Sequence, residues 1–230
     1  ANRSGVPLPP PPDVVPSQRQ FEFFVDFEYF TNVNVDFETQ WPSLEGKEMI
    51  FLIGVGQAHQ GEWRYQALMA AAEDQDHELQ LFEDFIDYLD ATTDGAFLDA
   101  SATALYHWSR AEVWQSRRAA DRHQLPDDHP LRQLPWCDLQ KPFLAGPGAL
   151  PGAWKYGLKD VAKALGDLAP DFATHWPGDL DKGLTAMVMG WEAYQSPDPA
   201  ATEEMGLLAQ YLEADCQALW NILRWLRAVS

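Results

Sequence analysis

Hydrophobic and polar residues alternate most regularly at residues 21–30, which read FEFFVDFEYF. Successive side chains of a β-strand point to opposite faces of its sheet. One face would carry Phe21, Phe23, Val25, Phe27 and Tyr29, and the other Glu22, Phe24, Asp26, Glu28 and Phe30. Because both faces carry aromatic side chains, the pattern predicts a buried central strand on which Asp26 and Glu28 are neighbours.

Two further segments extend this strand into a sheet. Residues 49–56 (MIFLIGVG) form an apolar run that is typical of a buried strand, and residues 63–69 follow as a third strand after a polar turn at 59–62. Consecutive strands with short connections favour antiparallel pairing. The first three strands are therefore predicted to form an antiparallel meander.

Helical periodicity dominates the rest of the chain. Apolar residues at helical spacing predict helices over residues 78–89, 156–166, 184–194 and 202–229, of which the second would end at Gly166. Further strands are expected at 103–108 and 136–143. Ser109 as N-cap with Glu112 three residues later fits a capping box before a helix that reaches about residue 124. This order predicts an α/β fold, with a mixed sheet in which parallel strands extend the meander and helices flank both.

Composition divides the chain into two parts. Residues 1–20 are rich in proline and predict a leader or linker, whereas residues 21–230 are long and apolar enough for one domain. Cys137 and Cys216 are the only cysteines, so a disulfide framework is excluded and a reducing compartment is favoured. No apolar run predicts a membrane span or a signal peptide. We expect a cytoplasmic protein, and the absence of an initial Met suggests either a processed chain or a piece of a longer polypeptide.

The net charge of -19 weighs against extended contact with nucleic acid, because phosphate neutralisation normally requires a basic surface. An enzyme that binds only a few nucleotides through bound cations needs a smaller basic surface. The densest basic region comprises Arg110, Arg117, Arg118 and Arg122. It is either a phosphate-binding surface or a solvated helix face whose charges pair with acids such as Asp121 and Asp127.

Acidic residues stand on three elements where they could meet. They are Asp26 with Glu28, Glu112 at the start of a helix, and Asp215 one helical turn after Tyr211. Carboxylates buried among aromatic side chains need a compensating cation. Mg²⁺ or Mn²⁺ prefers such oxygen ligands, and two ions about 4 Å apart can assist phosphodiester displacement.

These motifs together resemble the DEDD exonucleases of the ribonuclease-H-like superfamily. The resemblance rests on Asp26-Phe27-Glu28, the strand at residues 50–56, the segment Leu105 to Glu112, and Tyr211 followed by Asp215. Its nearest subgroup is similar to the YprB-type predicted exonucleases, in which the segment equivalent to residues 156–159 recurs. The resemblance spans residues 21–228 and implies a ribonuclease-H-like fold.

The resemblance also implies a site and an activity. Asp26, Glu28, Glu112 and Asp215 would bind two Mg²⁺ or Mn²⁺ ions, and Tyr211 would position the attacking water. Glu112 departs from the wider family, which more often has Asp there. The implied activity is 3′–5′ exonuclease action on nucleic acid, with a single-stranded 3′ end as substrate. The alternatives are a non-catalytic binding or docking module of a larger protein, and a phosphodiesterase that acts on small nucleotides.

Several residues remain open between a functional and a structural role. Trp108 could stack a terminal base, and Arg110 and Lys159 could contact the substrate. Glu112 could cap its helix, bind metal, or do both. The remaining uncertain positions are His107, interpreted as a structural histidine; Asp138, a possible further acid near the site; and Asp36 with Glu38, a second copy of the acid pattern that is interpreted as a surface strand or loop.

Overall fold

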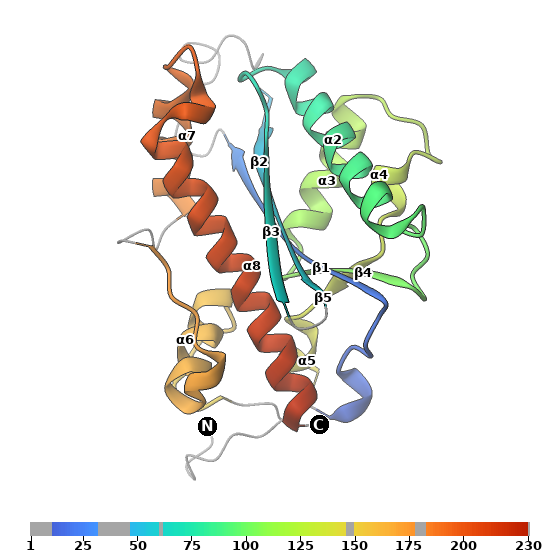
Figure 1. The fold of residues 1–230 in the computed structure, drawn as a ribbon, viewed down its shortest axis with the longest axis vertical. Helices are drawn as coiled ribbons and strands as arrows, with labels where there is room; N and C mark the ends of the chain where they lie inside the picture. Colours follow the sequence, from blue (N-terminus) through green and yellow to red (C-terminus); the bar gives the residue numbers. More distant parts are fainter. Residues whose placement is uncertain (1–10, 32–46, 60–61, 146–149, 178–182, 230) are drawn as a thin grey trace.

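A five-stranded mixed sheet forms the centre of the protein (Figure 1). The computed structural model describes residues 11–31, 47–59, 62–145, 150–177 and 183–229. The strand order is β3-β2-β1-β4-β5, with bounds β1 Phe21–Phe30, β2 Met49–His59, β3 Glu62–Met69, β4 Thr103–His107 and β5 Trp136–Asp138. Antiparallel pairing joins β1 to β2 and β2 to β3, whereas β4 and β5 add in parallel. The predicted α/β class, with a meander extended by parallel strands, is confirmed.

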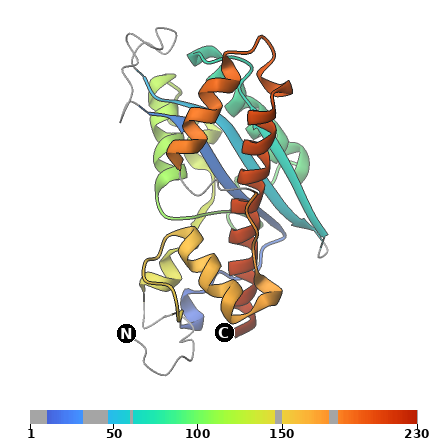
Figure 2. The same cartoon turned by 90° about the vertical axis from the view of Figure 1, so that its left-hand side faces the viewer.

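Helices cover both faces of this sheet (Figures 1 and 2). One side carries α2 (Gln75–Thr93), α3 (Ala111–Arg122) and the short α4 (Pro130–Gln133), and the other carries α6 (Leu158–Leu168), α7 (Gly183–Tyr194) and α8 (Glu203–Val229). The remaining short elements are η1 (Pro12–Val14), α5 (Lys141–Leu144), η3 (Pro170–Phe172) and η4 (Pro199–Ala201). No helix in the described parts of the chain is long and apolar enough to cross a membrane.

The side chains of β1 lie on opposite faces of the sheet, as the alternation predicts. Phe27 meets Phe82 and Phe85 of α2 in edge-to-face contacts, while Phe24, on the opposite face, stacks on Tyr106 at 5.3 Å between ring centroids. A register shift between Glu28 and Tyr29 marks a bulge near the end of the strand. Bulges re-aim side chains at strand ends. Here the bulge lies next to the predicted acid pair.

A glycine in β2 sets how closely α8 approaches the sheet. Gly54 is paired with Asp26 of β1. A Cβ atom at Gly54 would lie 3.0 Å from the Cβ of Leu212 and 3.0 Å from the Tyr65 hydroxyl, tighter than such contacts normally allow. The missing side chain therefore lets α8 pack directly over β2. Leu212 lies between Tyr211 and Asp215 in the sequence of α8. Its close contact with β2 at Gly54, which is paired with Asp26, therefore brings Tyr211 and Asp215 close to β1.

The ends of two predicted elements differ from those in the structure. The strand expected at 136–143 ends at Asp138, and α5 begins at Lys141 because Pro142 suits the first turn of a helix. Gly166 does not end α6, which continues to Leu168 and has Ala169 as its C-cap. Residues 1–10 of the proline-rich segment lie outside the described part, while its later part forms η1, and the Pro16 carbonyl accepts a hydrogen bond from Arg227.

Candidate active site

The proposed metal ligands and Tyr211 line one cavity of about 580 Å³, called here the acid cavity. It opens between the ends of β1 and β4, the start of α3, the start of α6 and the middle of α8. Seven of the residues singled out from the sequence line it, namely Asp26, Glu28, Trp108, Glu112, Lys159, Tyr211 and Asp215. The structure thus brings the four acids and the tyrosine together from three elements that are far apart in the chain.

The four carboxyl groups repel one another in a buried setting. Burial, followed by the charges of Asp215, Glu112 and Glu28, raises the pKa of Asp26 well above its ordinary value, and Asp26 also shares a hydrogen bond with Glu112. Burial and then the charge of Asp215 raise the pKa of Glu28 to about 8. Such a cluster cannot be fully ionised unless positive charge enters it. The cavity is therefore built to accept cations or protons.

Lys159, Tyr211 and Asp215 form a chain of contacts on one side of the cavity. The Lys159 ammonium donates a hydrogen bond to the Tyr211 hydroxyl at 2.8 Å. Tyr211 in turn hydrogen-bonds Asp215. Burial raises the pKa of Asp215 to about 6, an increase that Lys159 and hydrogen bonds from Trp176 and Tyr211 reduce. Burial and the acids Asp215, Glu28 and Asp26 also raise the pKa of Tyr211, so its phenol keeps its proton.

Trp176 is a site residue that the sequence did not reveal. Its indole nitrogen donates a hydrogen bond to Asp215 Oδ1 at 2.8 Å. It lies in a segment of loop-like composition, and a lone tryptophan there carries no periodicity that could relate it to α8. Sequence spacing holds no signal for this contact.

Glu112 does not cap its helix. Ser109 has a φ of 68° and is not the N-cap. The N-cap is Arg110, whose side chain makes no capping hydrogen bond. The backbone nitrogen of Ser109 instead donates to Asp138 Oδ1 at 3.0 Å. The predicted capping box is therefore wrong, because a residue from the neighbouring strand β5 holds the turn. Glu112 is 5% exposed, and its side chain faces the acid cavity without a helix-capping task.

His107 approaches Glu112 from β4. Its Nδ1 lies 3.3 Å from Glu112 Oε2, yet neither atom has a hydrogen-bond partner among the described residues. The His107 ring packs edge-on against Trp136 and is buried. The structural role inferred for His107 from the sequence stays a prediction, and a buried carboxylate oxygen of Glu112 lacks a hydrogen-bond partner among the described residues.

The residues of the acid cavity fit a hard divalent cation. Their donors are carboxylate oxygens, the ligand type that Mg²⁺ and Mn²⁺ prefer. Glu112 Oε2 has no hydrogen-bond partner among the described residues and could bind such an ion. Within the described ranges, no three Asp, Glu, His or Cys side chains already stand in a metal-ligand arrangement. Asp26 is hydrogen-bonded to Glu112 and Asp215 to Trp176, so their side chains would have to exchange these partners for the ion.

The remaining predicted positions lie elsewhere. Trp108 borders the acid cavity but is 8% exposed, and its indole nitrogen donates to the Tyr156 carbonyl, which leaves little surface for stacking. Arg110 and Asp138 line a different cavity. Asp36 and Glu38 lie outside the described residues.

The expected basic cluster on α3 is divided by its partners. Arg118 pairs with Glu48 at 2.8 Å, and Arg122 forms a buried ion pair with Glu78 of α2. Asp121, expected to pair within the α3 face, pairs with Arg132 instead. The arginines of α3 therefore do not form one solvated helix face whose charges pair with acids of the same helix.

Comparison with known protein families gives one match, over residues 33–227, to the family described as RNase_H superfamily. The match begins after β1 and includes all the other described strands together with α3 and all but the last two residues of α8. Neither the search of the curated proteins nor the search of the solved structures finds a match. The resemblance drawn from the sequence motifs is thereby confirmed at the level of the superfamily. With its sheet order and with most of its length matched, the chain belongs to the RNase H superfamily.

Proposed function

We propose that this chain is a metal-dependent 3′–5′ exonuclease of the tyrosine-type DEDD branch, similar to the YprB-type enzymes. One observation carries the proposal. Asp26, Glu28, Glu112 and Asp215 converge with Tyr211 in one cavity of a chain that belongs to the RNase H superfamily. The direction of degradation and the branch are what the resemblance of the motifs to the DEDD exonucleases implies.

Asp26, Glu28, Glu112 and Asp215 are the residues that would hold the Mg²⁺ or Mn²⁺ ions. When bound, such ions activate water and neutralise the charge that develops on a phosphodiester undergoing displacement. The raised pKa values of Asp26 and Glu28 support this assignment, because a cation would replace the protons that the buried carboxyl groups otherwise retain.

Tyr211 is suited to orient a water molecule rather than to deprotonate it. Its phenol keeps its proton because burial and the surrounding acids raise its pKa. Lys159 donates to the Tyr211 oxygen, so the phenol proton points away from the ammonium group. The same ammonium brings a positive charge into an otherwise acidic cavity, where it can meet a phosphate oxygen of the substrate.

The test is hydrolysis of single-stranded DNA and RNA labelled at the 5′ end. Shortening from the 3′ end is expected with Mg²⁺ or Mn²⁺ and not with EDTA. Asp26→Asn should lower the rate by more than ~100-fold, since it removes a proposed metal ligand. Asp84→Asn, on the exposed face of α2, is the matched control and should leave the rate unchanged. Undiminished hydrolysis by Asp26→Asn would exclude the proposed centre.

The second candidate is a non-catalytic binding or docking module. It is favoured by the net charge of -19, and by the absence, among the described residues, of three side chains already arranged as metal ligands. Calorimetric titration with Mn²⁺ separates the two candidates. Binding that is lost in Asp26→Asn supports the exonuclease, whereas no binding to the unmodified chain supports the module. Hydrolysis of small phosphodiesters but not of oligonucleotides would identify a small-nucleotide phosphodiesterase.

A further inference from the structure

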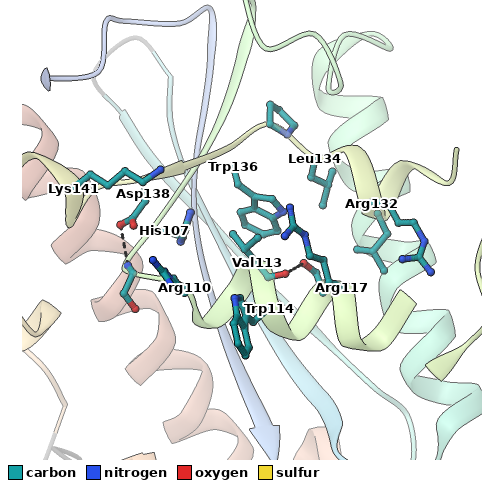
Figure 3. Close-up of a pocket in the computed structure, with 14 residues that line it drawn as sticks. His107, Arg110, Val113, Trp114, Arg117, Arg132, Leu134, Trp136, Asp138 and Lys141 are labelled. Carbon is teal, nitrogen blue, oxygen red and sulfur yellow. Dashed lines mark hydrogen bonds between the residues drawn. The ribbon is translucent and has the colours of Figure 1, made fainter. Parts of the chain in front are cut away.

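A second cavity, of about 570 Å³, lies between α3 and β5 (Figure 3). It is called here the basic cavity, because four cationic side chains line it: Arg110, Arg117, Arg132 and Lys141. Arg110 and Arg117 come from the start and the middle of α3, whereas Arg132 belongs to α4 and Lys141 begins α5. The sequence does not predict this gathering, because the cations come from three helices.

The charge of this cavity is opposite to that of the protein. The chain has 16 Lys and Arg against 35 Asp and Glu, yet Asp138 is the only acid among the described residues that line the cavity. Asp138 already accepts hydrogen bonds from the backbone nitrogens of Ser109 and Gln140 through Oδ1. A concentration of positive charge in an acidic protein marks a place where anions are attracted.

Three of the four cations have no carboxylate partner within the described part of the chain. Arg110, Arg117 and Lys141 are exposed and form no ion pair there, in contrast to Arg118 and Arg122 on the same helix. Arg132 is bound to Asp121 and to the Leu125 carbonyl, and so forms a fixed wall. Guanidinium groups match phosphate oxygens with paired hydrogen bonds. The ligand that suits these groups carries phosphate.

Aromatic side chains accompany the cations. Trp114 lines the basic cavity and is 57% exposed, which is unusual for a side chain so large and apolar. Trp136 lines the opposite wall and is half-buried. Cationic groups interleaved with exposed aromatic rings are the combination with which proteins bind nucleotides, the former at phosphates and the latter by stacking on bases.

A third hollow borders both cavities. It has a volume of about 400 Å³ and shares Tyr29 and Ala111 with the acid cavity. With the basic cavity it shares Arg110 and Trp114. The three hollows therefore adjoin one another around the first turns of α3. A track of this kind suits a polymer that continues beyond the acid cavity better than it suits a single nucleotide.

We infer that the basic cavity binds the sugar-phosphate backbone of single-stranded nucleic acid whose end lies in the acid cavity, with Trp114 stacked on a base. The location of the strand end rests on the proposed function, whereas the binding of the strand by the basic cavity does not require hydrolysis. Arg110 is thus a substrate contact in this cavity, whose lining does not include the proposed metal ligands.

The test measures binding without catalysis. Fluorescence anisotropy is recorded in EDTA with labelled oligothymidylate and oligouridylate of about 12 nucleotides, a length within the range of single-stranded binding sites. The variants are Arg110→Ala combined with Arg117→Ala, and Trp114→Ala alone. Arg64→Ala removes one positive charge from an exposed site on β3, at the opposite edge of the sheet, and serves as the control. Thermal unfolding verifies that each variant is folded.

The expected result is a loss of affinity of about tenfold for the double arginine variant and of similar size for Trp114→Ala. The slope of log affinity against log salt should fall by about 0.7 for each phosphate contact removed from a single strand. Arg64→Ala should bind like the unmodified chain. Where hydrolysis occurs, the double variant should raise KM and leave kcat unchanged, because these residues bind substrate away from the reacting phosphate.

Failure of this inference differs from failure of the proposed function. If no oligonucleotide is hydrolysed with any metal but the double variant still loses affinity, the exonuclease proposal fails and the basic cavity keeps its role. If the double variant binds like Arg64→Ala, or the unmodified chain does not bind, the inference is overturned. It is also overturned if thymidine monophosphate competes as strongly as the oligonucleotide, since the cavity would then take free nucleotides.

Discussion

The Lys159 ammonium donates a hydrogen bond to the Tyr211 hydroxyl and lies 4.2 Å from the centre of the same ring. Lys159 lies in the first turn of α6, and Tyr211 belongs to α8. The pair therefore joins two helices at the wall of the acid cavity. The charge of Lys159 also lowers the pKa values of Glu28 and Asp215 against the larger effect of burial. One side chain therefore sets the position of the phenol and eases ionisation of the acids.

Lys159→Met should lower kcat for oligonucleotide hydrolysis by about 10- to 100-fold, because the phenol loses the donor that orients it. Tyr211→Phe should cost a similar factor. If the two act as a unit, the double variant should be little worse than either single variant, which a double-mutant cycle measures. Lys159→Arg, which keeps the charge, is the conservative control and should recover part of the activity. Full additivity of the two losses would contradict a joint role.

Gly54→Ala should reduce both stability and activity, although Gly54 is not in the acid cavity. Its new Cβ would lie 3.0 Å from the Leu212 Cβ, so α8 must move away from β2 and carry Tyr211 and Asp215 with it. Overpacking of this kind costs about 1–3 kcal/mol of unfolding free energy. The control is Gly206→Ala in the first turns of α8, where a Cβ would meet nothing within 4 Å. Urea unfolding and oligonucleotide hydrolysis are measured for both; equal behaviour of the two variants would refute the packing argument.

Local patterns predicted β1 and its acid pair correctly because alternation depends only on the strand itself. The same holds for the apolar stripe of α8, whose predicted range differs from the observed one by a single residue at its start. The Ser109 capping box failed for the opposite reason. Its outcome depends on Asp138, a residue 29 positions away whose carboxylate holds the turn.

The geometry of the acid cavity depends on contacts of the same long-range kind. Motif order suggested which acids belong together, but their convergence depends on the close approach of α8 at Gly54. The contact of Trp176, and the joining of Arg132 and Lys141 to the cations of α3, were not predicted because these residues come from elements with no fixed spacing in the chain. Sequence reasoning thus reached the residues of the acid cavity and missed the side chains that support them.

Glu78→Ala should strongly destabilise the fold. This carboxylate of α2 is fully buried and accepts hydrogen bonds from the Ile50 backbone nitrogen and from Arg122, with His123 Nε2 2.8 Å from its other oxygen. It thereby joins α2 to β2 and to the end of α3. Removal leaves the Arg122 charge without its partner, which costs about 3–5 kcal/mol.

The measurement is the urea midpoint, which should fall without a change in the slope of the transition. Glu83→Ala, on the exposed face of the same helix, is the control and should change the unfolding free energy by less than about 0.5 kcal/mol. A Glu78→Ala midpoint equal to that of the control would show that the network contributes nothing.

The ion pair between Glu22 and Arg227 should make stability depend on pH below the ordinary range of a glutamate. Burial alone would raise the pKa of Glu22, but hydrogen bonds from Arg227, the Arg19 backbone and Tyr106 outweigh it and leave the pKa below its usual value of 4.5. A carboxyl group with a lowered folded-state pKa stabilises the fold fully above its unfolded-state pKa. That contribution is lost as the pH falls below 4.5 and through the folded-state pKa.

Glu22→Gln isolates this contribution. The free energy of unfolding of the unmodified chain should exceed that of Glu22→Gln at pH 7, and the difference should shrink as the pH is lowered towards about 3, since the carboxylate of the unmodified chain then becomes protonated as well. Urea unfolding at several pH values gives the difference directly. Glu62→Gln, exposed on β3, should show no such trend. A difference between the unmodified chain and Glu22→Gln that stays constant with pH would mean that the interaction acts through side-chain packing rather than through the charge of Glu22.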